Sequence, residues 1–386
     1  MMMWLQKFKM QPQEFRIQDS VVRTIKDLQY PNDVEKPPFG LFALASMISP
    51  MDRNSLENLT ETYFQISPEI LASFPRFRPP LNLFLFKESI GELVPFSFAD
   101  HRLHKTQVEQ LHAECARGNI FVARSDHLIY ARHISKQLDL ILMDTNLKET
   151  EIAHILAQGL CDRLGIMFDQ PVKTSLEQVQ TDLAILVQYL TGDPFRIKSL
   201  LRGLPAGPGL EKQAYTTTIC GLALCFELLG TELKTPFVQR MTLGLAMTPL
   251  GLSKTPRYIR DKESSRTPEE EQAFLRHPFI AATLLKKLGI REEITLKCVL
   301  EHRERLDGSG FPQQLPQGSI SQPGRISGLA SAFARLFSSH TDPSAQDILG
   351  MGTRLGREAS SFDPHLSNLL QAFLTSVFRS PRPDSR

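Results

Sequence analysis

Apolar residues at helical spacing dominate this chain from about residue 144 onward. Two stripes, over 152–164 and 176–190, place an apolar side chain every three or four residues, which is the period of a helix with one buried face. The segment 202–210 contains three glycines and two prolines and predicts a turn. The helical pattern resumes over 211–336 and again over 344–378. The chain is therefore expected to fold mainly as packed helices.

A strand pattern precedes the helices. The segment 81–86 is short, apolar and aromatic, follows two prolines, and predicts a strand, as do 92–98 and 120–123. Between the last two, apolar residues at helical spacing predict a helix over 105–115. We expect a small unit of two strands, a helix and a third strand across about 76–135.

A chain of 386 residues exceeds the usual size of one core, which favours more than one domain. We expect five segments: a poorly defined extension over 1–75, a small α/β module over 76–143, connecting helices and a linker over 144–210, a helical domain over 211–336, and C-terminal helices with a tail over 337–386. The fold class is α+β, mainly helical, preceded by a small strand-containing N-terminal domain.

Charge and hydropathy exclude several functions. The 44 Lys and Arg nearly balance the 42 Asp and Glu, and no basic run gathers into a patch, which argues against nucleic-acid and membrane-surface binding. The longest apolar run, 218–230, is shorter than the roughly 20 residues that span a bilayer. Lysines interrupt the first residues, unlike a secretion signal. Five cysteines without a C-x-x-C pair indicate buried apolar residues. We expect a cytoplasmic protein without a membrane span.

Two histidines are expected to point into the helical interior. A capping box at Thr267, followed by proline, predicts the start of a helix that runs to about residue 288 and turns His277 inward. A second helix over 292–304 turns His302 inward and leaves the arginines after it free to reach solvent. A single histidine on an apolar face is usually a core residue. A pair on neighbouring helices also suits a metal site.

The two blocks that carry these histidines, HPFIAATLLKKLG at 277–289 and EHRERLDGSGFP at 301–312, resemble the HD-GYP branch of the HD metal-dependent phosphohydrolases. Enzymes of this family hydrolyse the bacterial second messenger cyclic di-GMP. The resemblance covers about 211–336, and implies an HD-like helical bundle in a protein of bacterial cyclic di-GMP signalling.

Most metal-ligand positions of the family hold other residues here. Thr248 and Pro249 stand at the positions of the family's HD pair, and Gly251 at the position of the glycine that follows it. His277 matches the histidine of HP, and His302 and Arg303 match the two histidines of HHE. Ser331 stands at the position of the aspartate on the last helix. Pro249 has no side-chain atom that could bind a metal ion, and the hydroxyls of Thr248 and Ser331 bind divalent ions weakly. A guanidinium at ~4 Å from a cation would repel it by several kcal/mol. We therefore expect no catalytic residue and no cofactor.

Arg303 leaves two alternatives open. With Arg305 or Lys254, it could hold a phosphate by bidentate hydrogen bonds in place of the metal. Alternatively, it pairs with Glu301, Glu304 or another acid and binds no ligand.

The glycine-rich loop is retained better than the ligands. It comprises Asp307, Gly308, Gly310, Phe311 and Pro312. The glycines allow a tight turn with positive φ, and Asp307 can cap it. The resemblance implies contacts between this loop and partners such as diguanylate cyclase domains. Alternatively, the loop only joins two helices.

Three functions remain open. The first is a catalytically inactive signalling protein that binds a protein partner or cyclic di-GMP. The second is a working phosphodiesterase that binds iron or manganese through His277 and His302, with Glu301, Glu304 and Asp307 as replacement ligands. The third is a helical scaffold in which the old site is only core.

Overall fold

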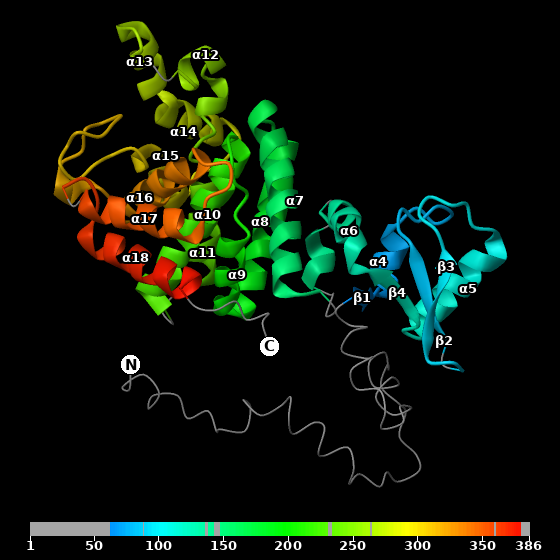
Figure 1. Ribbon diagram of the computed structural model, residues 1–386. Coiled ribbons are helices and arrows are strands. Elements are labelled where there is room, and N and C mark those ends of the chain that lie inside the picture. The colour runs from blue at the N-terminus through cyan, green and yellow to red at the C-terminus, as the bar shows by residue number, and fades with distance from the viewer. Residues whose placement is uncertain are drawn as a thin grey trace. The chain divides into compact units, whose positions relative to one another are not determined.

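The computed structural model describes residues 62–379, apart from 88, 136–137, 143–146, 231–233, 263–264 and 359. Most of the extension expected over 1–75, and the tail after residue 379, lie outside the described residues. The described part is mainly helical with one small antiparallel sheet, which confirms the predicted fold class (Figure 1).

The sheet is built from four strands in the order β1-β4-β2-β3, all antiparallel. They are β1 (Tyr63–Gln65), β2 (Leu83–Lys87), β3 (Glu92–Ser97) and β4 (Ile120–Ala123), accompanied by α4 (Pro68–Ser73) and α5 (Lys105–Ala116). The three predicted strands and the helix between them are confirmed. β1 and α4 were not predicted, because three and six residues are too short to show a period.

The rest of the described chain is helical. Its α-helices are α6 (His127–Ile134), α7 (Glu149–Asp169), α8 (Lys173–Gly192), α9 (Ile197–Arg202), α10 (Leu210–Leu229), α11 (Thr235–Ala246), α12 (Arg257–Arg260), α13 (Pro268–Leu275), α14 (His277–Lys287), α15 (Glu293–Glu301), α16 (Gln322–Ser338), α17 (Ala345–Arg357) and α18 (Pro364–Phe378). The two predicted stripes are α7 and α8. The predicted turn separates α9 from α10.

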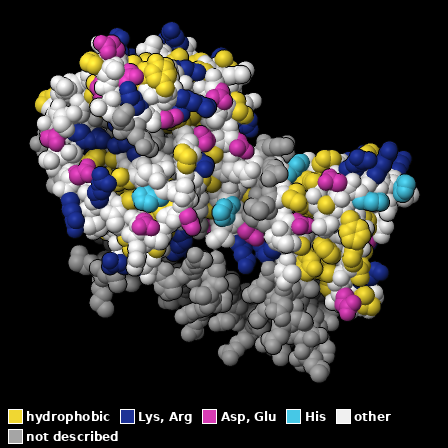
Figure 2. Space-filling model, turned by 45° about the horizontal axis from the view of Figure 1, so that its top comes forward, with side chains coloured by type: hydrophobic (Ala, Val, Ile, Leu, Met, Phe, Trp, Pro, Cys, Tyr) yellow, Lys and Arg dark blue, Asp and Glu magenta, His cyan; other side chains and the backbone are white. Residues whose placement is uncertain are grey.

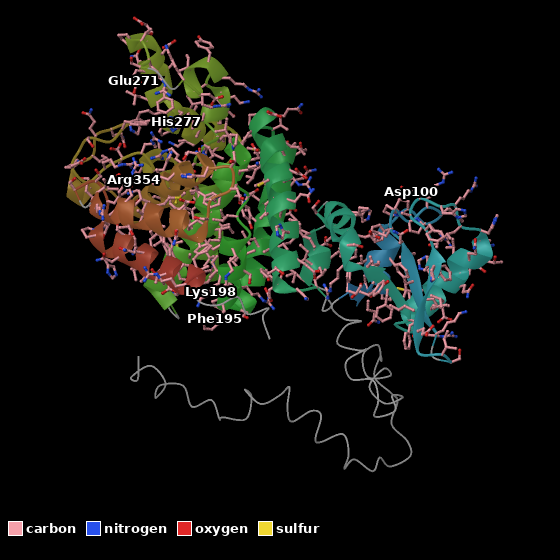
Figure 3. The ribbon with its side chains drawn as sticks, viewed as in Figure 1. Asp100, Phe195, Lys198, Glu271, His277 and Arg354 are labelled. Carbon is pink, nitrogen blue, oxygen red and sulfur yellow. The ribbon has the colours of Figure 1, made fainter. Side chains whose placement is uncertain are left out.

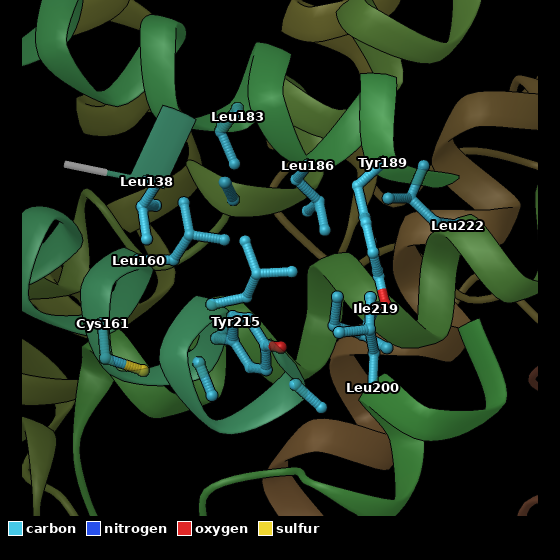
Figure 4. Packing of buried hydrophobic residues seen from close by; sticks show 14 of the residues in the cluster. Leu138, Leu160, Cys161, Leu183, Leu186, Tyr189, Leu200, Tyr215, Ile219 and Leu222 are labelled. Carbon is cyan, nitrogen blue, oxygen red and sulfur yellow. The ribbon is translucent and has the colours of Figure 1, made fainter. Parts of the chain in front are cut away.

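Helix α10 forms the centre of this helical region. It packs against α7, α11, α16 and α18, and every residue from Ala214 to Cys225 is buried. A helix that is apolar on all sides requires neighbours on all sides. Figure 4 shows Tyr215 and Ile219 of α10 among leucines of α7, α8 and α9. This packing fixes α11 and α16, which carry two parts of the site described below.

Two helices end earlier than the sequence predicted. The helix that begins at Thr267 stops at Leu275, and α14 starts anew at His277, because Pro278 has no N–H to continue the first helix. The helix expected to reach residue 304 ends at Glu301. Both breaks fall beside the histidines and decide where their side chains point.

Within the described residues, no helix is both long and apolar enough to cross a membrane.

Candidate functional site

His277 and His302 face each other at the start of α14 and the end of α15. Their Nε2 atoms are 3.2 Å apart, and the two rings are 0% and 3% exposed. Nδ1 of His277 donates to the carbonyl of Phe274 at 2.7 Å, and Nδ1 of His302 donates to that of Val299 at 2.8 Å. Because a carbonyl only accepts, each neutral ring carries its proton on Nδ1 and presents an Nε2 lone pair to the other ring. Figure 3 shows His277 inward of α13, the helix that carries Glu271.

Both imidazoles are held neutral. Burial, and after it the positive charge of Arg303, lower the pKa of His277 to about 3. The pKa of His302 is also lowered, first by burial and then by His277 and Arg303. The pair therefore offers two uncharged acceptors directed at one point.

This neutral pair predicts a loss of stability in acid. An unfolded histidine takes up a proton near pH 6.5, whereas folded His277 does not until about pH 3. The free energy of unfolding should therefore fall by up to about 1.4 kcal/mol per pH unit for this residue as the pH decreases from about 6 to 4. Urea unfolding at several pH values measures that slope. His277→Gln should reduce the slope, and the exposed His101→Gln should not. An equal slope in wild type and His277→Gln would refute a neutral His277.

The positions matched to the family's other ligands lie on α16 and in the turn after α11. The Oγ of Ser331, on α16, donates to the carbonyl of His302 at 3.2 Å. Thr248 and Pro249 lie in the turn after α11. Gly251, in the same turn, lies close to α14: a Cβ added to it would be 1.9 Å from the carbonyl oxygen of His277. Thr248 donates its hydroxyl to the carbonyl of Leu245 at 2.9 Å. Neither hydroxyl is thus directed at a ligand.

Arg303 lies over two aromatic rings at the edge of the histidine pair. Its guanidinium carbon is 5.0 Å from the ring centre of Phe311 and 5.7 Å from that of Phe274, and the Phe311 ring is 5.7 Å from the His277 ring. The expectation that Arg303 reaches freely into solvent is wrong. Because α15 ends at Glu301, the chain turns and directs this half-buried side chain over the rings.

The expected pairing of Arg303 with an acidic neighbour is not observed. Among the described residues, the side chain of Arg303 has no hydrogen bond or ion pair; its backbone carbonyl accepts from the N–H of Phe311 at 3.1 Å. Glu301 accepts from the backbone N–H and hydroxyl of Ser321, at 2.8 and 2.6 Å. Glu304 accepts from the backbone N–H groups of Gln313 and Leu315, at 2.7 and 3.0 Å. Both carboxylates therefore accept hydrogen bonds from backbone N–H groups and a hydroxyl, and neither pairs with a charged side chain among the residues described.

The carboxylate of Asp307 also accepts hydrogen bonds from its neighbours. It accepts from the N–H and hydroxyl of Ser309, at 2.9 and 2.6 Å, and from the hydroxyl of Ser361 at 2.9 Å. These hydrogen bonds lower its pKa, with the Ser309 hydroxyl as the largest cause. The loop that follows has Gly308 at φ +75°. Gly310, expected at positive φ, instead lies against the backbone of Glu304 and Arg305, where a Cβ would be 2.3 Å from the Arg305 nitrogen. The peptide bond between Phe311 and Pro312 is cis.

Sequence reasoning missed one residue of this site, Arg335. It follows Ser331 by one turn of α16 and donates to its carbonyl at 3.3 Å. Burial and then Arg305 lower the pKa of Arg335 to about 9. Arg335 is in turn the largest charge effect that lowers the pKa of Arg303, after burial. The spacing of four residues from Ser331 on one helix was the signal that could have identified it.

The two other predicted phosphate ligands have separate contacts. Lys254 donates to the carbonyls of Phe168 and Asp169, at 3.1 and 3.2 Å, at the end of α7. Arg305 lies over the ring of Phe362, at 4.5 Å, and donates to the carbonyl of Glu304 at 2.7 Å. Lys254 is thus committed to capping a helix.

The residues of this site do not fit the metal ions that the family resemblance implies. A hydrolytic centre needs several anionic or imidazole ligands around one ion. In the part of the chain that the structure describes, no group of three or more His, Cys, Asp or Glu side chains could hold a metal. Two imidazoles with an adjacent guanidinium remain.

The helical bundle and the paired histidines agree with the fold that the sequence resemblance implies. Residues 211–366 match the family model described as HD domain. This match, together with the relatives below, supports an HD-GYP-type domain over these residues.

Curated relatives match parts of the chain. It is 30% identical over 120 residues to cyclic di-GMP phosphodiesterase PdeB of Borreliella burgdorferi, a match that covers 31% of each chain. It is 26% identical over 193 residues to cyclic di-GMP phosphodiesterase PA4108 of Pseudomonas aeruginosa, a match that covers 50% of this chain and 46% of the relative. These matches span less than half of either relative.

A solved structure shares the fold. Bd1817, described as an HDG"Y"P protein from Bdellovibrio bacteriovorus, superimposes with a TM-score of 0.54 over 81% of this chain and 99% of that one, at 14% identity. At this identity the likeness concerns the fold alone.

Proposed function

We propose that this chain is a regulatory HD-GYP-type protein that does not hydrolyse cyclic di-GMP and acts by binding a partner in bacterial signalling. The observation that carries the proposal is the use of the nearby carboxylates. Glu301 and Glu304 are bound to backbone and hydroxyl donors, so that the histidine pair faces a guanidinium and no acid. A divalent ion at about 4 Å from that guanidinium would be repelled by about 8 kcal/mol at an effective dielectric constant of about 20.

The alternative is a working phosphodiesterase with iron or manganese held by replacement ligands. Glu301, Glu304 and Asp307 would have to leave their present hydrogen bonds and turn toward the histidines. Charge-assisted hydrogen bonds contribute about 1.5–3 kcal/mol each, and Glu301 and Glu304 are 6% and 4% exposed. Freeing Glu304 would also leave two backbone N–H groups without a partner.

The hydrolysis experiment decides between these two functions. The full chain, supplied with iron or manganese under anaerobic conditions, is incubated with cyclic di-GMP and the linear and mononucleotide products are quantified. We expect no product above that of the metal salts alone. Metal-dependent turnover that a chelator abolishes would overturn the proposal in favour of the phosphodiesterase.

The proposed partner contact is the exposed side of the glycine-rich loop. Asp307, Ser309 and Gln313 are exposed there, and Glu304 and Asp307 hold the backbone in one conformation. A preformed loop loses little conformational entropy on binding. A diguanylate cyclase domain is the partner that we propose to test. Gln313→Arg should weaken its binding in a calorimetric titration, and Gln188→Arg on α8 should not. Binding that is equal in both variants would exclude this surface.

A further inference from the structure

Three arginines lie near the histidine pair, Arg266, Arg303 and Arg335, and of these three only Arg266 has an ion pair within the described residues. In the part of the chain that the structure describes, the side chain of Arg303 has no hydrogen bond or ion pair, and the side chain of Arg335 donates only to the carbonyl of Ser331. Arg266 differs, because it lies 3.5 Å from Glu271 and donates to the carbonyls of Ile259 and Arg260. Unused guanidinium N–H groups are thus concentrated on Arg303 and Arg335.

The surroundings hold the guanidinium of Arg303 in place. It lies over the rings of Phe274 and Phe311, and cation–π contacts of this kind favour a fixed orientation. Phe274 also contacts the guanidinium of Arg266, at 3.9 Å. A half-buried arginine that is positioned in this way, without an acidic partner, keeps its donors available to a ligand.

The charges of the two arginines disfavour each other. Burial comes first, and Arg335 second, among the causes that lower the pKa of Arg303. Arg335 donates to the carbonyl of Ser331, whose hydroxyl donates to the carbonyl of His302, the residue before Arg303. Two guanidinium groups placed near each other in this way lose free energy unless an anion lies beside them. General surface charge does not explain this pair, since basic and acidic side chains are mixed on the face of the helical region in Figure 2.

We propose that Arg303 and Arg335 together bind the oxyanion of a phosphate group beside the paired histidines. A phosphate carries several oxygens and up to two negative charges, so it can accept from two guanidinium groups at once, whereas one carboxylate matches only one. The inference rests on the proposed function, because a metal ion would compete for the same space. The phosphate can belong to free inorganic phosphate or to the phosphodiester of a nucleotide.

Thermal unfolding of the full chain in increasing inorganic phosphate, at constant ionic strength with chloride, tests the site. We expect the melting temperature of the wild type to rise with phosphate, because a ligand that binds only the folded state stabilises it. Arg303→Met keeps an aliphatic stem between the two phenylalanines. It should melt higher than the wild type without phosphate, because an unpaired, half-buried charge is removed, and should not respond to phosphate. Arg335→Met should weaken the response by about tenfold in phosphate concentration.

A matched control removes a charge elsewhere. Arg117→Met, at an exposed position at the end of α5, should respond to phosphate as the wild type does. A wild type that does not respond, or an Arg303→Met that responds equally, would overturn the proposal. A lower melting temperature of Arg303→Met without phosphate would also contradict it, since Arg303 would then stabilise the fold by itself.

Calorimetry with cyclic di-GMP separates the two sources of phosphate. Binding about tenfold tighter than that of inorganic phosphate, lost in Arg303→Met, would assign the site to a phosphodiester. Binding of inorganic phosphate alone would assign it to the free anion. All titrations are repeated after chelation, because phosphate held through a metal ion would be released, whereas phosphate held by arginine would not. A metal-loaded chain, which contradicts the proposed function, is thereby distinguished from a failure of the arginine site.

Discussion

Replacement of Glu304 by alanine is expected to lower the free energy of unfolding by about 3–5 kcal/mol. The carboxylate is 4% exposed and accepts from two backbone N–H groups, those of Gln313 and Leu315. Hydrogen bonds to a charged group contribute about 1.5–3 kcal/mol each, and both donors would lose their partner. Urea unfolding measures the loss, and hydrogen exchange at residues 306–315 locates it. Exchange there should accelerate more than exchange in α10.

The matched control is Glu304→Gln, which keeps one side-chain carbonyl oxygen. The glutamine oxygen can accept from one of the two N–H groups, whereas its NH₂ group faces the other and cannot accept. We therefore expect roughly half of the loss in the free energy of unfolding. A Glu304→Ala variant as stable as the wild type would show that the carboxylate does not hold the loop. It would then be available to a metal ion, in conflict with the proposed function.

Gly251→Ala is expected to destabilise the chain by roughly 3 kcal/mol or more. An added Cβ would lie 1.9 Å from the carbonyl oxygen of His277 and 2.7 Å from its carbonyl carbon. These are backbone atoms at the start of α14, so α14 must move away from the turn after α11. Overpacking of a rigid contact costs about 1–3 kcal/mol, and more where backbone must shift. Urea unfolding provides the measurement.

Gly350→Ala is the control for this substitution. Gly350 is exposed within α17 and has no atom within 4 Å of an added Cβ. Alanine in a helix interior is favoured over glycine by about 0.5–1 kcal/mol, so this variant should be slightly more stable. Equal stability of Gly251→Ala and the wild type would mean that the turn and α14 are farther apart than the structure places them.

The periodic parts of the fold could be predicted from the sequence. The apolar stripes identified α7 and α8, the capping box at Thr267 is formed as expected, and the segment 202–210 separates α9 from α10. Each of these signals is local. β1 gave no signal, since its three residues become a strand only by pairing with β4.

The site was predictable only in part. The two histidine blocks identified His277 and His302, which lie 3.2 Å apart. The end of α15 at Glu301 was missed, because the contact made by this carboxylate is with Ser321, twenty residues later. The direction of the Arg303 side chain depends on where α15 ends, and that of the Arg335 side chain depends on the position of α16. Side-chain direction at a helix end follows from tertiary contacts, which helical periodicity does not encode.

The central claim is that the site of the paired histidines holds no hydrolytic metal centre. The most direct test is the metal content of the full chain, expressed with added iron and manganese and purified anaerobically, measured by inductively coupled plasma mass spectrometry beside a His277→Gln and His302→Gln double variant. We expect much less than one ion per chain, and the same content in the double variant. One or two ions per chain in the wild type, lost in the double variant, would contradict the claim.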